Sequence, residues 1–182
     1  MNKLVLALAG AGALALGLPA APATAAFESV EAKEAASDAA EMARMDMLEA
    51  FGTTSLKPGQ YRWRDLPGDG PARVVVSLSD QLAFLYRGST LVAVSTISSG
   101  KPGKDTPTGV FPILEKKKFH RSIKYENAPM PFMQRLDRFG IALHAGHLPG
   151  HPASHGCVRL PGEFAAKLFQ VTTVGTPVLI GA

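Results

Sequence analysis

The chain has 182 residues, of which 46% are hydrophobic and 19% charged, and its formal net charge is +4 at pH 7. This length is typical of one compact domain with a short extension. A single cysteine excludes a fold held together by intramolecular disulfides, and the absence of any motif that reads bases argues against a nucleic-acid partner.

Residues 1–25 have the three parts of a secretory signal peptide. Lys3 supplies a positive start, residues 4–18 are apolar, and residues 23–25 read Ala-Thr-Ala, a typical cleavage site. An uncleaved membrane anchor is the alternative, but the apolar run is short for a span of ~20 residues and is interrupted by glycine and proline. We therefore expect cleavage after Ala25 and export, with the periplasm as the favoured compartment.

Residues 28–51 contain much alanine, glutamate and methionine and no proline or glycine, which predicts a helix. A weak apolar stripe is expected on it: Val30, Ala35, Ala39, Met42 and Leu48. One interpretation is a helix that spaces the domain or binds a partner. The other, which we favour, is a solvated or partly disordered tail. We expect the methionines at 42, 45 and 47 to pack on the domain rather than bind metal.

Charge is divided unevenly along the chain. Residues 28–50 hold seven acidic and two basic side chains, a net charge of −5, whereas residues 51–182 hold 16 basic and 8 acidic ones, a net charge of +8. Such a basic region would attract an anionic polymer such as a cell wall. Simple solubility explains the same charge, so both interpretations stay open.

Residues 52–71 are rich in proline and glycine and predict a linker, in which an aromatic side chain of residues 61–63 docks on the domain. From residue 73 onward, short runs of apolar and β-branched residues predict strands at 73–76, 82–86, 91–97, 109–114, 141–144 and 178–180, with a short helix at 163–169. This spacing favours an all-β sandwich or barrel. We therefore divide the chain into a signal peptide (1–25), a helical extension with a linker (26–71) and one main domain (72–182).

The only cysteine lies in the most informative segment, residues 154–160, which read Ser-His-Gly-Cys-Val-Arg-Leu. In an exported protein, a lone cysteine is either a thiol kept for chemistry or a buried passenger. A second histidine, His144, lies 13 residues before Cys157. A thiol, two candidate bases and an arginine thus fall within one short stretch.

This segment resembles the active-site signature of the L,D-transpeptidases with a YkuD-type catalytic domain. An earlier block, residues 96–111, resembles that family too, through Ser-Ser-Gly followed by Thr-Pro-Thr-Gly-Val-Phe. The resemblance extends over about residues 73–180. It departs from the family at His144, which precedes Ala145 and Gly146 instead of a single glycine, and in a shorter loop before Ser154.

The resemblance implies a mostly β, L,D-transpeptidase-like sandwich or barrel with short helices, here with an N-terminal helical extension. It implies that Cys157 is the nucleophile, that His144 is its base, and that His155 contributes orientation and electrostatics. The residues alone leave His155 as a competing base, because in an extended segment it points to the same side as Cys157. His144 also has a simpler interpretation, a core histidine bound to a backbone carbonyl.

Three further residues of the segment have assignable roles. Gly156 can take unusual backbone angles, so N–H groups of residues 155–157 are expected to form an oxyanion hole, and a larger residue there should cost turnover rather than stability. The guanidinium of Arg159 suits a substrate carboxylate, or a local acid. Ser154 either bonds a catalytic histidine or caps the turn, and we count it with Arg159 as a substrate-binding candidate.

The function implied by the resemblance is transfer at peptidoglycan tetrapeptide stems. A thioester forms on Cys157 with release of D-alanine, and an amine then takes the acyl group to form a 3–3 crosslink or to attach an outer-membrane protein or lipoprotein. Water in place of the amine would make an L,D-carboxypeptidase. Diaminopimelate is favoured over lysine as the third stem residue. No cofactor is expected, and the oligomeric state is not readable.

Alternatives outside this family stay open. His144, His147, His151, His155 and Cys157 offer possible zinc ligands, although prolines within the run exclude a single helical face. A papain-like or cell-wall endopeptidase would place its cysteine before its histidine. A non-catalytic wall-binding module would use basic residues at 116–118 and 121. These basic residues either contact the wall or are simply solvated, and the same two interpretations apply to Lys101, Lys104 and His120.

Overall fold

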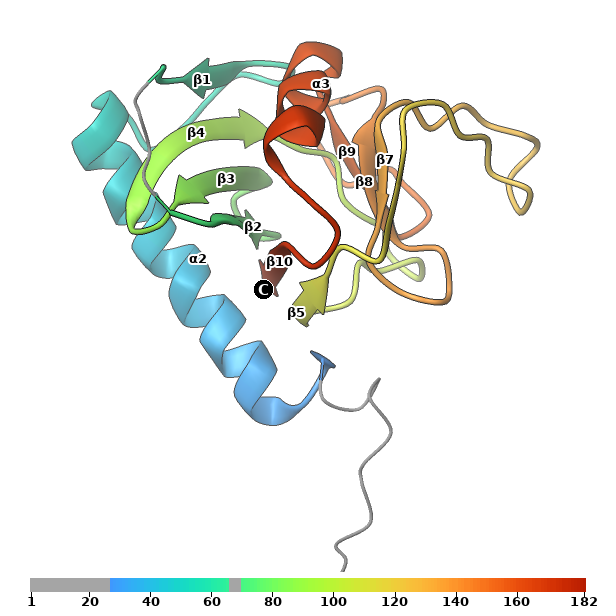
Figure 1. The fold of residues 1–182 in the computed structure, drawn as a ribbon, viewed down its shortest axis with the longest axis horizontal. Coiled ribbons are helices and arrows are strands. Elements are labelled where there is room, and N and C mark those ends of the chain that lie inside the picture. The colour runs from blue at the N-terminus through green and yellow to red at the C-terminus, as the bar shows by residue number, and fades with distance from the viewer. Residues whose placement is uncertain (1–26, 66–69) are drawn as a thin grey trace, which may run out of the picture.

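The structure is a computed structural model that describes residues 27–65 and 70–182, so the predicted signal peptide lies outside the described residues. The described residues form two β-sheets and two helices (Figure 1). The larger sheet has the order β1 (Tyr61–Trp63), β4 (Thr90–Thr96), β3 (Leu82–Arg87), β2 (Ala72–Ser77), β10 (Pro177–Gly181) and β5 (Gly109–Pro112). The smaller sheet has the order β6 (Glu115–Lys117), β7 (Met133–Arg135), β8 (Ala142–Ala145) and β9 (Val158–Leu160).

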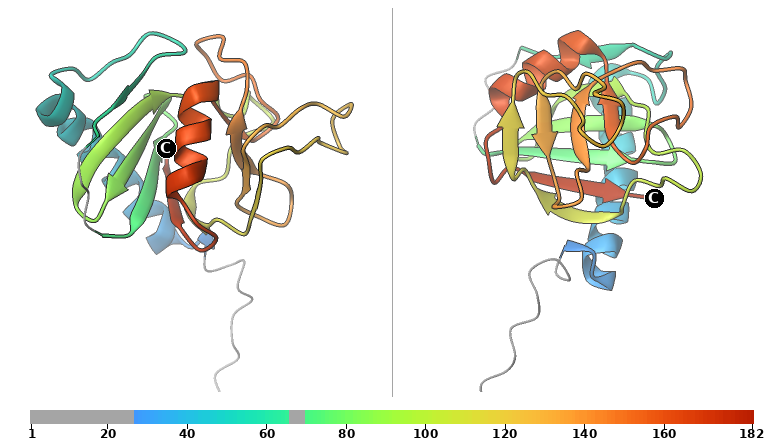
Figure 2. Two further views of the ribbon diagram at one scale, coloured as in Figure 1. Left: turned by 45° about the horizontal axis from the view of Figure 1, so that its top comes forward. Right: turned by 90° about the vertical axis from the view of Figure 1, so that its right-hand side faces the viewer.

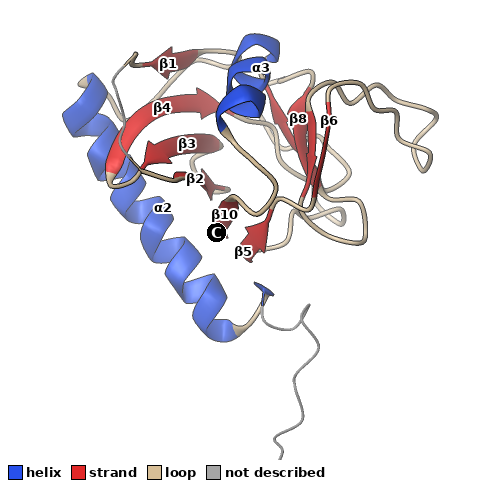
Figure 3. Ribbon diagram, in the orientation of Figure 1, coloured by secondary structure: helices blue, strands red, loops and turns tan. Residues whose placement is uncertain are grey.

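The main hydrophobic core lies between the two sheets, whose strands are red in Figure 3. Strand β2 shows why, because its side chains alternate between the faces of the sheet. Val74 and Val76 join the core shared with β8 and β9, whereas Val75 lies in a second core on the opposite face. Helix α3 (Gly162–Val171) closes the main core with Phe164 and Leu168. This mostly β, two-sheet architecture confirms the expected fold class.

Helix α2 (Val30–Phe51) packs along the outer face of the larger sheet, as Figures 1 and 3 show. Its buried positions are Ala36, Ala39, Ala40, Ala43 and Met47. Alanines let the helix approach closely, and a Cβ added at Gly181 on β10 would lie 2.6 Å from a helix carbonyl oxygen. A 22-residue helix is confirmed, but the favoured interpretation of a solvated tail is wrong.

The predicted apolar stripe on this helix is also wrong, except at Ala39. Val30, Met42 and Leu48 are 66%, 60% and 47% exposed, and Ala35 is exposed as well. Of the three methionines, only Met47 packs on the domain. The sheet packs against the face that carries four alanines and Met47, because helix and sheet fit closely there, and the other large apolar residues named above face away from it.

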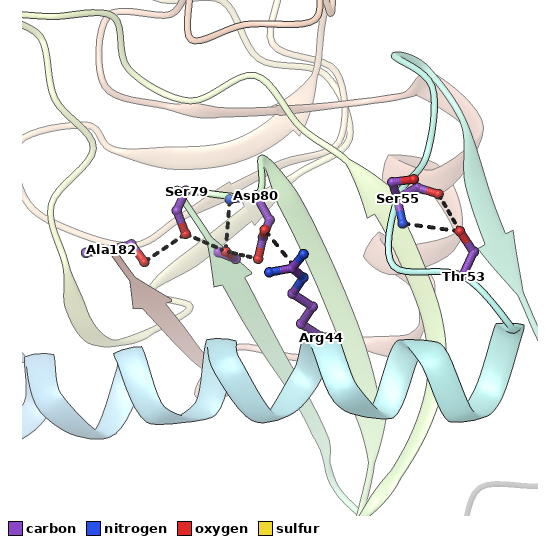
Figure 4. Close-up of polar contacts among 7 residues, drawn as sticks. Arg44, Thr53, Ser55, Ser79, Asp80 and Ala182 are labelled. Carbon is purple, nitrogen blue, oxygen red and sulfur yellow. Dashed lines mark hydrogen bonds and ion pairs between the residues drawn. The ribbon is translucent and has the colours of Figure 1, made fainter.

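Polar contacts fix the helix on the sheet. The hydroxyl of Tyr86 on β3 donates a 2.6 Å hydrogen bond to Asp46 of the helix. Figure 4 shows Arg44 reaching from the helix to Asp80, at the turn between β2 and β3. Ser79, in the same turn, donates to the carbonyl oxygen of the last residue, Ala182. These contacts tie the helix and the C-terminus to one turn of the larger sheet.

The segment predicted as a linker contributes a strand. Strand β1 pairs antiparallel with β4, and the rings of Tyr61 and Trp63 lie 5.8 and 5.9 Å from the ring of Phe164 on α3. The expected aromatic docking is confirmed, and this part of residues 52–71 belongs to the larger sheet. Within the described ranges, no helix is both long and apolar enough to cross a membrane.

The two methionines at 45 and 47 provide a matched test of how helix α2 packs. Met47 is 0% exposed in the second core, whereas Met45 is 63% exposed. We expect Met47→Ala to lower the free energy of unfolding by about 2–5 kcal/mol, because it removes buried methylene groups and leaves a cavity. Met45→Ala should change it by less than about 0.5 kcal/mol. Urea unfolding of both variants measures the difference, and equal effects would contradict this packing.

Candidate active site

Strands β8 and β9 run in parallel and bring the two halves of the site together. His144 on β8 lies opposite Arg159 on β9, and Cys157 directly precedes β9. Because side chains alternate along a strand, His144, Cys157 and Arg159 share one face of the smaller sheet. Leu143 and Val158, from the other face, are fully buried in the core. The first three side chains line one pocket of about 700 Å³.

Hydrogen bonds from an earlier segment, residues 98–106, hold the loop that carries Cys157. Ser98 and Arg159 exchange two backbone hydrogen bonds, and the carbonyl of Ser99 accepts from the amide of Ser154. Thr106 accepts from the amide of Gly100 at 2.9 Å and donates to the carbonyl oxygen of Gly156 at 2.9 Å. The two sequence blocks noted above are therefore one structural unit, in which the first supports the second.

Ser154 closes the turn in front of the cysteine. Its hydroxyl donates to the carbonyl oxygen of Cys157 and accepts the amide of Gly156 at 3.1 Å, and the residue is buried. This geometry corresponds to the turn-capping interpretation, since no hydrogen bond joins Ser154 to a histidine within the described residues. Its contribution to the site is the position of Cys157.

Gly156 is required by the local backbone. Its φ is +114°, and a Cβ there would lie 2.7 Å from Cδ1 of Ile141. The structure thus revises two expectations. A larger residue at 156 will cost stability, and the amide of Gly156 is not free for an oxyanion hole because it donates to Ser154. The amides of His155 and Cys157 remain as candidate donors.

His144 is 7% exposed, and its Nδ1 lies 2.8 Å from the carbonyl oxygen of Ala145. This contact requires a proton on Nδ1, so in the neutral ring Nε2 carries a free lone pair and can accept a proton. Burial lowers the pKa of His144, and the charges of Arg159 and His120 lower it further, against the effect of the carbonyl. The contact expected of a core histidine thus also prepares the ring as a base.

The thiol of Cys157 donates to the carbonyl oxygen of Gly140 at 3.5 Å. Burial raises the pKa of this thiol, and the carboxylate of Asp137 adds to the effect. The backbone of Ala142 and the charge of Arg159 oppose it. Because the pKa of the thiol is raised and that of His144 is lowered, both groups are neutral near pH 7, and the resting site holds no thiolate–imidazolium pair.

Arg159 carries a positive charge that no acid neutralises within the described ranges. Its side chain lies along Gly146, where a Cβ would come within 3.0 Å of it. In the family the glycine directly follows the histidine, whereas here it comes one residue later, at Gly146. The absence of a side chain at Gly146 leaves room for Arg159. The charge of Arg159 contributes to the lowered pKa of His144 and of His155, and it opposes the rise in the pKa of Cys157.

A long loop, residues 118–132, forms one wall of the pocket, and we call it the lid. It projects from the smaller sheet at the right of Figure 1, and two further views are given in Figure 2. Backbone bonds from Phe132 to Lys118 and from Met130 to His120 close its base. The ring of its Tyr125 stacks on His155, with ring centroids 4.5 Å apart. His155 is exposed. Desolvation lowers its pKa, and the positive charges of Lys101, Arg159 and Lys104 lower it further.

Sequence reasoning missed several residues of the site. Tyr125, Asp137 and Gly140 come from loops with no motif, and only their neighbours in space reveal them. Across residues 27–65 and 70–182, no group of three or more His, Cys, Asp or Glu side chains gathers closely enough to hold a metal ion. The ligand set that the zinc alternative requires is therefore not assembled.

Residues 71–180 match the family model of the YkuD L,D-transpeptidase catalytic domain. The chain is 29% identical to the probable L,D-transpeptidase YbiS of Escherichia coli K12, over 72% of this chain and 50% of that protein. It thus spans about half the length of this curated relative.

Solved structures agree on the fold. An L,D-transpeptidase from Xylanimonas cellulosilytica matches with a TM-score of 0.56 and 26% identity, over 63% of this chain and 62% of that one. An L,D-transpeptidase from Mycobacterium smegmatis matches with a TM-score of 0.57 and 20% identity, over 61% of this chain and 58% of that one. At 20% identity, the second match supports the fold alone.

Gly156 and Gly175 separate backbone strain from close contact. Both have positive φ, but a Cβ at Gly175 would meet nothing within 4 Å. We expect Gly156→Ala to lower the free energy of unfolding by about 0.5–1.5 kcal/mol more than Gly175→Ala, because only at Gly156 must a neighbouring atom, Cδ1 of Ile141, move aside. Denaturant unfolding measures both, and equal losses would contradict the contact with Ile141.

The charge of Arg159 should be visible in the reactivity of the thiol. The thiolate is the species that reacts with iodoacetamide, so the alkylation rate of Cys157 should rise with pH through a range above that of an ordinary thiol. Arg159→Met removes a charge that lowers the pKa of Cys157, and should move this profile to still higher pH. Methionine keeps an apolar stem beside Gly146, and Arg62→Met is the control. An unchanged profile in Arg159→Met would show that the guanidinium does not act on the thiol.

Proposed function

The chain belongs to the YkuD L,D-transpeptidase catalytic domain family, and from this premise we propose that it is a cysteine-dependent L,D-transpeptidase of peptidoglycan tetrapeptide stems. The observation that carries the proposal is the shared face of β8 and β9, on which a partly buried thiol, a histidine with a free Nε2 and an unpaired arginine line one pocket. Acyl transfer by a thiol needs a nucleophile, a base and a site for the substrate's charge.

The neutral resting pair defines the first step. Cys157 attacks the carbonyl carbon that joins the third stem residue to the terminal D-alanine. Its proton passes to Nε2 of His144 as the sulfur–carbon bond forms, so the thiolate is generated only during attack. The Nδ1–H of His144 keeps its hydrogen bond to the carbonyl oxygen of Ala145, which holds the ring in place and stabilises the charge that it acquires.

The second step releases D-alanine and leaves a thioester. The carbon–nitrogen bond breaks, and the imidazolium of His144 returns its proton to the leaving amine. Amides of His155 and Cys157 are the candidate donors to the oxyanion of the tetrahedral intermediate, a contribution of ~3–4 kcal/mol in related sites. Arg159 binds a carboxylate of the stem through its planar donor fork.

The third step transfers the acyl group. The amine of a second stem, or of an acceptor protein, attacks the thioester and loses a proton to His144. The thiolate of Cys157 then leaves and takes this proton back from His144. Water in place of the amine would give an L,D-carboxypeptidase from the same intermediate. We place this chemistry in the periplasm, after removal of residues 1–25, where the net positive charge of residues 51–182 favours contact with an anionic wall.

The nucleophile can be tested with imipenem, whose strained lactam carbonyl acylates an activated thiol without an acceptor. We expect intact-mass spectrometry to show one adduct per wild-type chain, peptide mapping to locate it on Cys157, and Cys157→Ser to give none. A folded wild-type protein without an adduct, or an adduct that persists in Cys157→Ser, would contradict the role of Cys157.

The base can be tested on the same reaction. His144→Gln should slow acylation by about 10²–10⁴-fold, because the thiol loses its proton acceptor. His151→Gln is the matched control, since only its backbone carbonyl contacts the site, through Ser98. His155→Gln should have a much smaller effect than His144→Gln. If His155→Gln is the slower variant, the role of base belongs to His155.

A further inference from the structure

Lys101 and Lys104 lie on a turn that is fixed beside the loop of Cys157. The amide of Lys101 donates to the carbonyl oxygen of Ser154 at 3.1 Å, and the amide of Lys104 donates to that of Lys101 at 2.8 Å. The turn also packs against Gly156, where a Cβ would lie 3.7 Å from the carbonyl oxygen of Lys104. The backbone of both lysines therefore keeps a constant position relative to the reactive thiol.

The charges of both lysines act on the site, because Lys101 and Lys104 each contribute, with Arg159, to the lowered pKa of His155. Both side chains are exposed, and within the described residues neither forms an ion pair. The acid next to them in sequence, Asp105, forms no ion pair there either. These lysines thus carry positive charge beside the pocket that a ligand can neutralise.

The pocket itself lacks negative charge. Its charged lining residues within the described ranges are Lys124, Arg135 and Arg159, and no aspartate or glutamate lines it. Arg135 is neutralised by Glu115, whose Oε2 lies 2.9 Å from Nε of Arg135. The nearby Asp137 accepts the amides of two residues of its own loop, at 2.9 and 2.8 Å. A ligand with a free carboxylate would therefore be attracted, and a ligand with a cationic side chain would be repelled.

We infer that Lys101, Lys104 and Arg159 form a carboxylate subsite beside His155, which makes this chain selective for stem peptides whose third residue carries a free side-chain carboxylate rather than an amide. This inference rests on the proposed function and narrows its substrate class to the unamidated diaminopimelate stem. The lysines are specificity-determining residues that act on binding, whereas the reacting groups are Cys157 and His144.

Two synthetic tetrapeptide stems test the inference directly. They are identical except that the distal carboxylate of diaminopimelate is free in one and amidated in the other, and release of D-alanine is measured for each. We expect the wild type to prefer the free acid by roughly tenfold in kcat/KM, the effect of two or three partly exposed ion pairs. Raising the salt concentration to about 0.5 M should reduce this preference, since exposed charges are screened.

A double variant assigns the preference to the lysines. Lys101→Met with Lys104→Met should raise KM for the free-acid stem and leave kcat and the amidated stem nearly unchanged, so that the preference falls to about twofold or less. Lys33→Met with Lys57→Met removes the same charge from exposed positions outside the turn that is bonded to Ser154, and should keep the preference. Melting temperatures show whether each variant is folded.

Each outcome of these experiments decides a different point. Equal turnover of the two stems by the wild type would overturn the inference and leave the proposed function standing. A preference that survives both salt and the Lys101 and Lys104 changes would exclude these lysines as its source. Turnover of neither stem by folded wild-type protein would overturn the proposed function, and the inference with it.

Discussion

The hydroxyl of Thr106 joins the two parts of the chain on which the site depends. It accepts from Gly100 and donates to the carbonyl oxygen of Gly156, while Ser98 and Ser99 bond the backbone on either side of the cysteine loop. A loop with a glycine at positive φ would otherwise have many conformations. Because these bonds fix it, Cys157 enters β9 on the same face as His144, and the pocket forms around both.

Burial explains why the thiol of Cys157 and the imidazole of His144 are both neutral in the resting site. Burial removes part of the hydration of the thiol and of the imidazole, so each is most stable in its neutral form. A permanent thiolate would react with many electrophiles, whereas in the proposed mechanism this pair becomes charged only when a substrate carbonyl is in reach. Arg159 favours the thiolate and disfavours the imidazolium, and its positive charge is the one that we propose binds an anionic substrate.

The sequence predicted the sandwich and the central strands because their apolar residues alternate with a clear period. It could not show strands β6, β7 and β9, since three-residue strands such as Glu-Lys-Lys leave no periodic signal. It placed Cys157, His144 and Arg159 together through their spacing and their resemblance to a family. The engaged amide of Gly156, the lid contact of Tyr125 and the alanine face of helix α2 depend on distant partners, and only the folded chain reveals them.

The most direct test of this account is to mix the protein with a tetrapeptide stem, quench the reaction with acid within milliseconds to seconds, and map the mass of the tryptic peptides. The account predicts a tripeptide acyl group on the peptide that contains Cys157, formed at the same rate as free D-alanine and faster than final product. D-alanine released without a covalent adduct at any quench time, or an adduct on another residue, would contradict a thioester on Cys157.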